Sequence, residues 1–339
     1  MHRRSFLKST SILLASSFLP IPSVLGNDNT SLIKPASLAS GDKVAVMAPA
    51  GAVFNTRYIS RIRQALDSLG MEVVLGDSVY SKYGYLAGTD RQRAEEFNRF
   101  IADSSVKAII AMRGGWGCSR MLPLINYELV KQNPKIVMGL SDITSLLLGL
   151  YTKANLVTFH GLVGYASWND FSVGHFKKVV MENKAYSMVN DDNTQRSAYT
   201  IVGGKAEGIL AGGNLTVLST MLGSEYVPNW SGKILFLEDL NEEPYSIDRM
   251  LTHLKIAGVL DQINGLIFGN CKRCYSSDPK ASFTIKQLLK QHIEPLGIPA
   301  YYGSNIGHIS NKFTVPIGVK ASIDADNKVI TLLDSAMRP

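Results

Sequence analysis

The sequence predicts an α/β fold, in which an N-terminal domain with a doubly wound parallel sheet precedes a smaller C-terminal α/β domain. Between residues 43 and 160, short apolar runs alternate with segments whose apolar residues recur at helical spacing. This alternation is typical of a parallel sheet that is buried on both faces. The 339 residues suffice for two domains, and 45% hydrophobic with 19% charged residues indicates a globular protein.

The elements of the first domain, which we expect to span residues 40–164, follow one another regularly. We expect strands at 43–47, 72–75, 107–112, 135–138 and 156–159, and helices at 57–69, 90–102, 118–132 and from 143 to about 151. Sheets of this kind bind ligands beyond the carboxyl ends of their strands. The glycine-rich run that begins at Arg113 and the segment 139–142 lie at two such ends.

Residues 165–200 are polar and rich in turn-forming residues, which predicts a linker with a short helix near 173–183. The C-terminal domain is then expected to span 201–339. Its expected elements are a glycine-rich turn at 212–214, helices near 215–222 and 245–257, strands at 233–237 and 265–268, and a β pair within 321–333.

The first 26 residues match a twin-arginine export signal. Arg3 and Arg4 precede Phe6-Leu7-Lys8, and an apolar stretch at 11–19 follows. That stretch is too short to span a bilayer. We therefore expect a periplasmic protein with no stable membrane insertion after signal removal, the alternatives being a membrane anchor or a chance basic start.

The charge balance gives no reason to expect a nucleic-acid partner. Removing the signal segment, with its three basic residues and no acid, lowers the formal net charge from +7 to +4. No later block of Lys and Arg with interleaved aromatic residues follows.

Cys271 and Cys274 form a CxxC pair, which fits a disulfide, a redox pair or half of a metal site. A zinc site needs a second pair of ligands, and no matching Cys/His pair stands nearby. We therefore favour structural or loosely paired thiols and expect neither metal nor cofactor. The sequence leaves open whether the two are bonded.

Ser141 lies between an apolar strand and a leucine-rich helical segment. A serine in such a turn presents its hydroxyl at the top of the sheet, beside backbone N–H groups that are free to bind an anion, as a nucleophile requires. The turn is not Gly-x-Ser-x-Gly, because Ile143 replaces the second glycine. This departure argues against the α/β-hydrolase fold.

A nucleophilic serine also needs a base and an acid. His308 follows a run of small residues in a loop, which makes it a better base candidate than a helical histidine. Glu238 stands at the tip of an apolar strand, where a parallel strand presents a side chain to a cleft. The neighbouring Asp239 fits a turn-capping role better.

The oxyanion would be bound by the N–H of Asp142 and that of Gly114 or Gly115, since glycines let a backbone approach a ligand closely. A dinucleotide-binding loop at these glycines is disfavoured, because a third glycine and the ribose-binding acid are missing. Arg113 could bind a substrate carboxylate or, equally well, form a surface or interdomain ion pair.

Five motifs occur in order: Arg113-Gly114-Gly115-Trp116-Gly117, Gly139-Leu140-Ser141-Asp142, Gly212-Gly213-Asn214-Leu215, Leu237-Glu238-Asp239 and Gly307-His308. Together they resemble the serine LD-carboxypeptidases, the muramoyltetrapeptide carboxypeptidase family, over nearly all of residues 40–325. The resemblance implies a Ser141-Glu238-His308 triad between two domains, in a metal-independent homodimer. The implied substrate is a murein tetrapeptide that loses its terminal D-alanine from an L-configured centre on diaminopimelate or lysine.

Two departures and two alternatives accompany this resemblance. The best-known recycling enzymes of the family are cytoplasmic, whereas this chain carries an export signal, and Leu162 stands where many relatives have proline. The family also includes self-immunity peptidases that cleave peptidyl-nucleotides of the microcin C type, for which Trp168 would be a stacking platform. The other alternative is an exported muropeptide-binding protein without catalysis.

Overall fold

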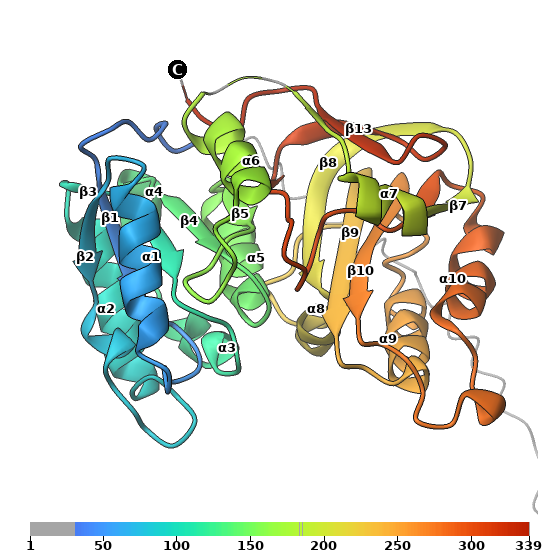
Figure 1. Ribbon diagram of the computed structural model, residues 1–339, viewed down its shortest axis with the longest axis horizontal. Helices are drawn as coiled ribbons and strands as arrows, with labels where there is room; N and C mark the ends of the chain where they lie inside the picture. Colours follow the sequence, from blue (N-terminus) through green and yellow to red (C-terminus); the bar gives the residue numbers. More distant parts are fainter. Residues whose placement is uncertain (1–30, 183, 185, 339) are drawn as a thin grey trace, which may run out of the picture. The chain divides into compact units, whose positions relative to one another are not determined.

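The computed structural model describes residues 31–182, 184 and 186–338, so the predicted export signal lies outside the described residues. The described chain folds around two sheets, each flanked by helices (Figure 1). This architecture confirms the predicted α/β fold class. None of the described helices combines the length and apolarity needed to cross a membrane.

The first sheet is mostly parallel, as predicted. Its strands lie in the order β12-β5-β4-β3-β1-β2, and every neighbouring pair is parallel except β12 with β5. The strands are β1 (Lys43–Met47), β2 (Glu72–Leu75), β3 (Val106–Ala111), β4 (Ile136–Gly139), β5 (Thr158–His160) and β12 (Val315–Ile317). Four of the five predicted strands match within one residue at each end, and β5 begins two residues later than expected.

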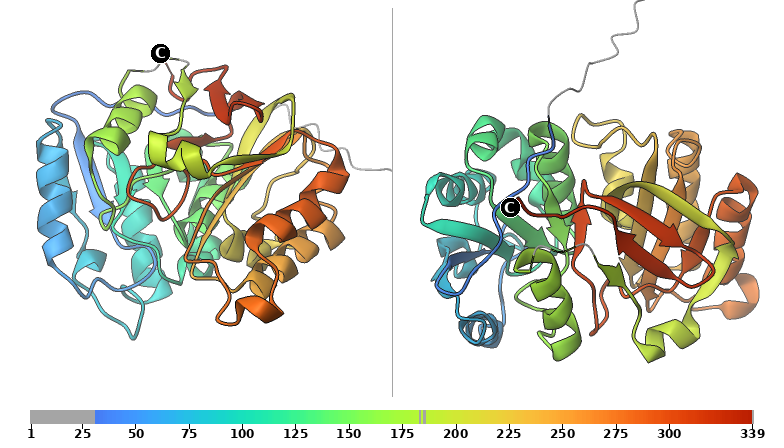
Figure 2. Two further views of the ribbon diagram at one scale, coloured as in Figure 1. Left: turned by 45° about the vertical axis from the view of Figure 1, so that its right-hand side comes forward. Right: turned by 90° about the horizontal axis from the view of Figure 1, so that it is seen from above.

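Helices cover both faces of this sheet, which explains why its strands are continuously apolar. The right-hand view of Figure 2 shows α1 and α6 on one face and α2, α4 and α5 on the other. The helices of this half are α1 (Arg57–Asp67), α2 (Asp90–Ala102), α3 (Cys118–Met121), α4 (Tyr127–Gln132), α5 (Ile143–Ala154) and α6 (Asp170–Val180).

The single helix expected at 118–132 is instead two helices, α3 and α4. A short 3-10 turn at Leu122–Leu124 separates them and contains Pro123. Proline lacks the N–H that a continuous helix would use, so the helix ends there. Asn126 then starts α4 by accepting a hydrogen bond from the N–H of Leu129.

The second sheet has eight strands, in the order β6-β14-β13-β8-β9-β10-β11-β7. The central run from β8 to β11 is parallel and the outer strands are antiparallel. The strands are β6 (Ser187–Met188), β7 (Tyr199–Val202), β8 (Lys205–Asn214), β9 (Lys233–Leu240), β10 (Gly265–Lys272), β11 (Ala300–Tyr302), β13 (Lys320–Asp324) and β14 (Val329–Leu332). The accompanying helices are α7 (Asp192–Ser197), α8 (Leu215–Met221), α9 (Pro244–Ile256) and α10 (Ile285–Ile293).

The segment 165–200 contains more structure than the predicted linker with one short helix. It holds α6, β6, α7 and the start of β7. β6 pairs with β14 and β7 pairs with β11, so this segment supplies both edges of the second sheet. Such short edge strands depend on pairing partners far along the chain, and their local sequence shows no periodicity that would reveal them.

Two further features of the C-terminal half differ from expectation. Gly212 and Gly213 lie inside β8 rather than in a turn, and a Cβ atom on Gly212 would clash with the carbonyl oxygen of Phe236 on the neighbouring strand. β12 leaves the C-terminal half and completes the first sheet beside β5, while β13 runs next to β8 in the second (Figure 2). The two sheets are therefore joined by more than one crossing of the chain.

Candidate active site

Ser141 lies at the sharp turn between β4 and α5. Its φ angle is 67°, in the left-handed region that non-glycine residues rarely adopt. The turn is closed tightly, because a Cβ atom on Gly139 would overlap the side chain of Ile143. A strained backbone at this position fits a functional turn that holds a serine hydroxyl out of the sheet.

Gly114 packs directly against Ser141. A Cβ atom on Gly114 would lie 2.6 Å from the Cβ atom and 2.9 Å from the Oγ atom of Ser141. The next residue, Gly115, has a φ angle of 106°. The carbonyl of Gly114 accepts a hydrogen bond of 3.1 Å from the N–H of Gly51, which ties the loop after β1 to this one. The structure thus brings the predicted glycine loop to the predicted nucleophile.

Asp142 follows Ser141, but its side chain is buried. Its Oδ2 atom accepts a hydrogen bond of 2.8 Å from the N–H of Cys118, at the start of α3. Burial raises the pKa of Asp142 to about 6. Its carboxylate therefore joins the Ser141 turn to the start of α3, and only its backbone remains a candidate for contact with a substrate.

Glu238 and His308 form a direct pair. The Oε2 atom of Glu238, on β9, lies 2.7 Å from Nδ1 of His308, in the loop between β11 and β12. Gly307 has a φ angle of 125°, and a Cβ atom there would lie 3.0 Å from the same carboxylate oxygen. Glycine before the histidine therefore permits this close approach.

Each member of the pair favours the charged form of the other. Burial by itself would raise the pKa of Glu238, but the charge of His308 and its hydrogen bond lower it below the ordinary value. Burial by itself would lower the pKa of His308, but the charge of Glu238 and the hydrogen bond raise it. Glu238 is therefore suited to stabilise an imidazolium at His308.

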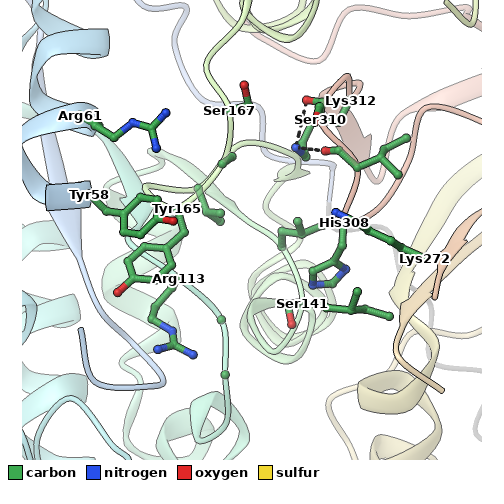
Figure 3. Close-up of a pocket in the computed structure, with 17 residues that line it drawn as sticks. Tyr58, Arg61, Arg113, Ser141, Tyr165, Ser167, Lys272, His308, Ser310 and Lys312 are labelled. Atoms are coloured by element: carbon green, nitrogen blue, oxygen red, sulfur yellow. Dashed lines mark hydrogen bonds between the residues drawn. The ribbon is translucent and has the colours of Figure 1, made fainter. Parts of the chain in front are cut away.

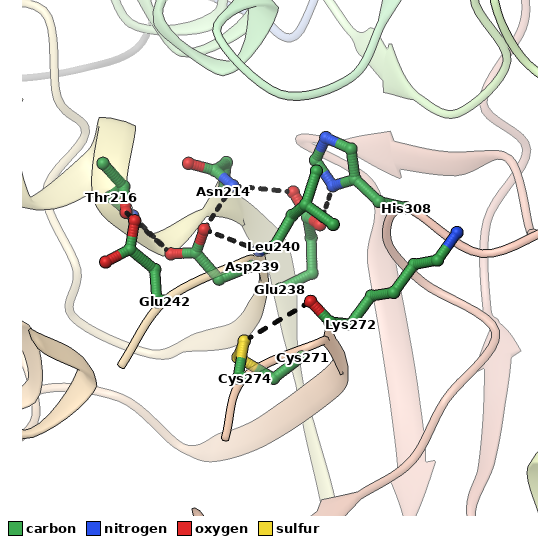
Figure 4. The surroundings of a disulfide bond; sticks show 10 residues. All are labelled: Asn214, Thr216, Glu238, Asp239, Leu240, Glu242, Cys271, Lys272, Cys274 and His308. Carbon is green, nitrogen blue, oxygen red and sulfur yellow. Dashed lines mark hydrogen bonds and ion pairs between the residues drawn. A yellow bond between two sulfur atoms is a disulfide. The ribbon is translucent and has the colours of Figure 1, made fainter. Parts of the chain in front are cut away.

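Asn214, which sequence reasoning placed in a motif without a role, orders the carboxylates of β9 (Figure 4). Its Nδ2 atom donates to Oε1 of Glu238 at 3.2 Å and to Oδ1 of Asp239 at 3.0 Å. Its Oδ1 atom accepts from the N–H of Val217 and caps α8. Asp239 also accepts hydrogen bonds from Thr216, and burial raises its pKa to about 6. It therefore has a structural role like the capping one expected.

A cavity of about 580 Å³ contains the remaining predicted site residues (Figure 3). It is lined by Arg113, Gly114, Gly115 and Ser141 from the N-terminal half and by His308 from the C-terminal half. Figure 3 shows the His308 ring and the Ser141 side chain in this same cavity. Within the described residues, the Ser141 hydroxyl makes no hydrogen bond to that ring.

Arg113 lies on the wall opposite His308. Its Nη1 atom donates to the carbonyl of Ala52 at 3.0 Å, and its guanidinium lies 5.3 Å from the ring centre of Tyr165. Tyr165 in turn stacks on Tyr58 of α1, with ring centres 4.1 Å apart. No carboxylate of the described chain pairs with Arg113. The ion pair considered from the sequence is therefore not formed there.

Other histidines differ from His308 in their surroundings. His160, at the end of β5, is buried, and neither ring nitrogen has a hydrogen-bond partner among the described residues. Burial lowers the pKa of His160 to about 4, so it is neutral beside the Glu238 pair. His175, on α6, is also buried, and its Nδ1 contacts the Tyr186 hydroxyl at 3.0 Å.

Trp168, considered as a stacking platform, does not line the cavity that holds Ser141. Its indole N–H donates to the carbonyl of Val163 at 3.1 Å, and its ring packs on Phe176. Cys271 and Cys274 are joined by a disulfide, the structural pairing that the sequence left open. Within the described residues, no group of three or more His, Cys, Asp or Glu side chains is placed to hold a metal ion.

Comparisons with known proteins identify the family and the fold of this chain. Residues 44–161 match the family description "LD-carboxypeptidase N-terminal domain", and residues 207–323 match "LD-carboxypeptidase C-terminal domain". A probable murein peptide carboxypeptidase of Bacillus subtilis (strain 168) is 35% identical over 305 residues, which cover 88% of this chain and 94% of the relative.

Two solved structures have the same fold. The microcin C7 self-immunity protein MccF, in its apo state, superposes with a TM-score of 0.84 at 26% identity, covering 90% of this chain and 100% of that one. The muramoyltetrapeptide carboxypeptidase from Oxalobacter formigenes superposes with a TM-score of 0.74 at 28% identity, covering 86% of this chain and 97% of that one.

Proposed function

Because this chain belongs to the LD-carboxypeptidase family, we propose that it is a serine-type carboxypeptidase that removes the terminal D-alanine from murein tetrapeptides. The observation that supports this best is the pairing of the buried Glu238 with His308, at 2.7 Å, where His308 lines the same cavity as Ser141. Nucleophile, base and acid come from positions far apart in the sequence, and chance seldom places three such groups together.

In the proposed mechanism, Ser141 attacks the carbonyl carbon of the scissile bond. Nδ1 of His308 faces Glu238, so Nε2 takes the proton from the hydroxyl as the C–O bond forms. His308 then gives that proton to the amine of D-alanine as the C–N bond breaks. A water molecule, deprotonated by His308, hydrolyses the acyl-enzyme and restores the Ser141 hydroxyl. Glu238 stabilises the imidazolium at each stage.

The developing oxyanion would be bound by the N–H of Asp142 and that of Gly114 or Gly115. Gly114 lies against Ser141, which puts the loop after β3 within reach of the reacting carbonyl. Arg113 would bind the terminal carboxylate of the substrate, since it lines the cavity and has no carboxylate partner in the described chain.

The test is to replace the nucleophile and measure D-alanine release. Ser141→Ala should keep its thermal stability and lose at least about 10³-fold in kcat for a murein tetrapeptide. Ser167→Ala is a matched control, because Ser167 lines the same cavity and has no role in the mechanism. Mass spectrometry of muropeptides incubated with each variant, with and without a chelator, would detect the product. Normal turnover by Ser141→Ala, or loss of activity with chelator, would refute a serine mechanism.

A second candidate keeps the triad and changes the substrate to a peptidyl-nucleotide. It is supported by the superposition on the microcin C7 self-immunity protein and by the stacked Tyr58–Tyr165 pair, which offers a flat aromatic wall inside the cavity. Competition between a murein tetrapeptide and a peptidyl-nucleotide for the purified protein distinguishes the two. A tight complex with either compound but no cleavage would indicate a binding protein instead.

We also propose, from the pattern of residues 1–26, that the protein is exported and acts in the periplasm, and, from the family resemblance, that it is a homodimer. Cell fractionation of the wild type and of an Arg3→Lys, Arg4→Lys variant tests export. The wild type should be found in the periplasm and the variant in the cytoplasm. Sedimentation of the purified protein tests the dimer.

A further inference from the structure

The cavity that holds Ser141 is strongly cationic. Arg61, Arg113, Lys272 and Lys312 all line it. No aspartate or glutamate is among the described residues that line it, and the buried Glu238 is already engaged by His308. None of the four cations forms an ion pair with a carboxylate of the described chain. The cavity therefore favours a substrate that carries negative charge.

These cations form two groups on opposite walls (Figure 3). Arg61 and Arg113 lie with Tyr58 and Tyr165 on one wall, whereas Lys272 and Lys312 lie on the His308 side. The arginines come from α1 and from the loop after β3, and the lysines come from the end of β10 and the loop before β12. Because Ser141 lies between the two walls, a substrate in place for attack would meet a cationic group on each side.

Lys312 is unusual because it is a buried cation. Its residue is only 4% exposed, and its Nζ atom donates to the backbone carbonyls of Ile309 and Ser310. An ammonium has three N–H donors, so one remains for a ligand in the cavity. Burial, followed by the charge of Lys272, lowers the pKa of Lys312 to about 8. The two ammonium groups therefore interact, and an anion between them would relieve both burial and repulsion.

Lys272 is the second member of this lysine pair. It is the last residue of β10, where it pairs with Leu240 of β9, and it directly follows the disulfide-bonded Cys271. The sheet and the disulfide fix its backbone, and its exposed side chain extends toward the cavity above the His308 ring (Figure 3). The fold thus fixes the backbone position of Lys272, whereas its side chain is exposed to solvent.

We propose that Lys272 and Lys312 form a subsite for a side-chain carboxylate on the residue whose carbonyl Ser141 attacks. This inference rests on the proposed function, in which Arg113 on the opposite wall holds the terminal carboxylate of the leaving amino acid. The residue on the acyl side then faces the lysine pair. The substrate class is a peptide whose penultimate residue carries a free carboxylate in its side chain, such as diaminopimelate. Lysine or an amidated residue would bring an ammonium or a neutral amide to the same place.

The experiment compares kcat/KM for three tetrapeptides that end in D-alanine and differ only in the third residue: diaminopimelate, its side-chain amide, and lysine. The wild type should favour the free acid over the amide by about tenfold or more, since hydrogen bonds to charged groups are strong. In Lys272→Gln, kcat/KM should fall by about that factor for the free acid and change little for the amide. Lys272→Arg should retain the preference. Lys290→Gln, on the exposed side of α10, is the matched control.

Lys312→Gln should show the same loss of preference for the free acid. This preference is the ratio of kcat/KM for the free acid to kcat/KM for the amide, so it does not depend on the fraction of the protein that is folded. Equal rates with the free acid and the amide in the wild type would overturn the inference, as would a preference that persists in both Lys272→Gln and Lys312→Gln. Release of D-alanine from none of the three peptides would instead refute the proposed function itself.

Discussion

A Cβ atom built on Gly114 would lie 2.6 Å from the Cβ atom of Ser141, closer than two such atoms can approach. The loop after β3 and the turn after β4 are thus packed so tightly that only glycine fits between them. This contact places backbone N–H groups, rather than a side chain, next to the hydroxyl. A preorganised backbone beside a nucleophile is what stabilisation of an oxyanion requires.

Gly114→Ala should therefore impair catalysis more than folding. The added methyl group must displace Ser141 or the loop, and small displacements of reacting groups cost about 10²-fold in rate. We expect kcat to fall by at least that factor, with a change in unfolding free energy of about 1–3 kcal/mol. Gly174→Ala is the control, because nothing lies within 4 Å of the added Cβ atom and the position is helical. Unchanged kcat in Gly114→Ala would contradict the tight contact.

The Glu238–His308 pair predicts a particular pH dependence. As a general base His308 must be neutral, so activity should fall as the pH falls through its pKa, which lies above the ordinary value of about 6.5. Glu238→Gln removes the charge that raises this pKa. The acid limb of the kcat/KM profile should then move to lower pH, while the plateau falls by about 10²–10⁴-fold. A profile whose acid limb does not move would show that another group titrates.

The same pair also links stability to pH. The raised pKa of His308 contributes stability below about pH 6.5, and this contribution is lost as the pH rises through the folded-state pKa. The lowered pKa of Glu238 contributes above about pH 4.3 and is lost as the pH falls through its folded-state value. Glu238→Gln should thus destabilise the protein most near pH 5–6 and less at pH 9. Thermal unfolding of both proteins across this range measures the difference.

Asn214→Ala tests whether a helix cap also positions the acid. The change removes the cap of α8, which typically costs about 0.5–2 kcal/mol, and one hydrogen bond to Glu238. We expect kcat to fall by about tenfold while KM changes less, because Glu238 becomes free to rotate away from His308. Asn126→Ala removes a comparable cap from α4, away from the cavity. It should lose similar stability and keep full kcat; equal kinetic losses in both variants would show that only stability matters.

The disulfide should affect both stability and substrate binding. Closing so short a loop stabilises a protein by about 2 kcal/mol on the chain-entropy account. Replacing both Cys271 and Cys274 by serine should cost about that amount. It should also raise KM for an acidic substrate, because Lys272 lies inside the closed loop. Reducing agent should reproduce both effects in the wild type and add nothing in the double variant. Sensitivity of the double variant to reductant would place the effect elsewhere.

Local sequence patterns sufficed for much of the first sheet. β1 and β2 agree with expectation residue for residue, since a continuously apolar run bounded by turn residues is a strong local signal. The turn at Ser141 was also evident, because its strand and helix adjoin it directly. The break between α3 and α4 differs from the single helix expected at 118–132, although Pro123 is a local signal for it.

The candidate site could be predicted only where a residue stands in a local pattern, such as a strand end or a loop, that indicates a function. Ser141, Glu238 and His308 can be singled out from strand ends and loops, but spacing does not show that Ser141 and His308 line one cavity with Glu238 buried behind His308. The sequence places Asn214 in a motif without indicating its role and does not single out Lys272 or Lys312, because an asparagine after glycines and single lysines are common in proteins. Their importance comes from what lies beside them in space.

By itself, the sequence determined the alternation of strands and helices, the turn that presents Ser141 and the composition of a globular chain, because these depend on neighbours within a few residues. Only the tertiary structure decided that β12 returns to the first sheet, that Glu238 meets His308, and that four cations line one cavity. Those relationships depend on strand pairing and packing between segments far apart along the chain. Local sequence patterns do not predict such long-range contacts.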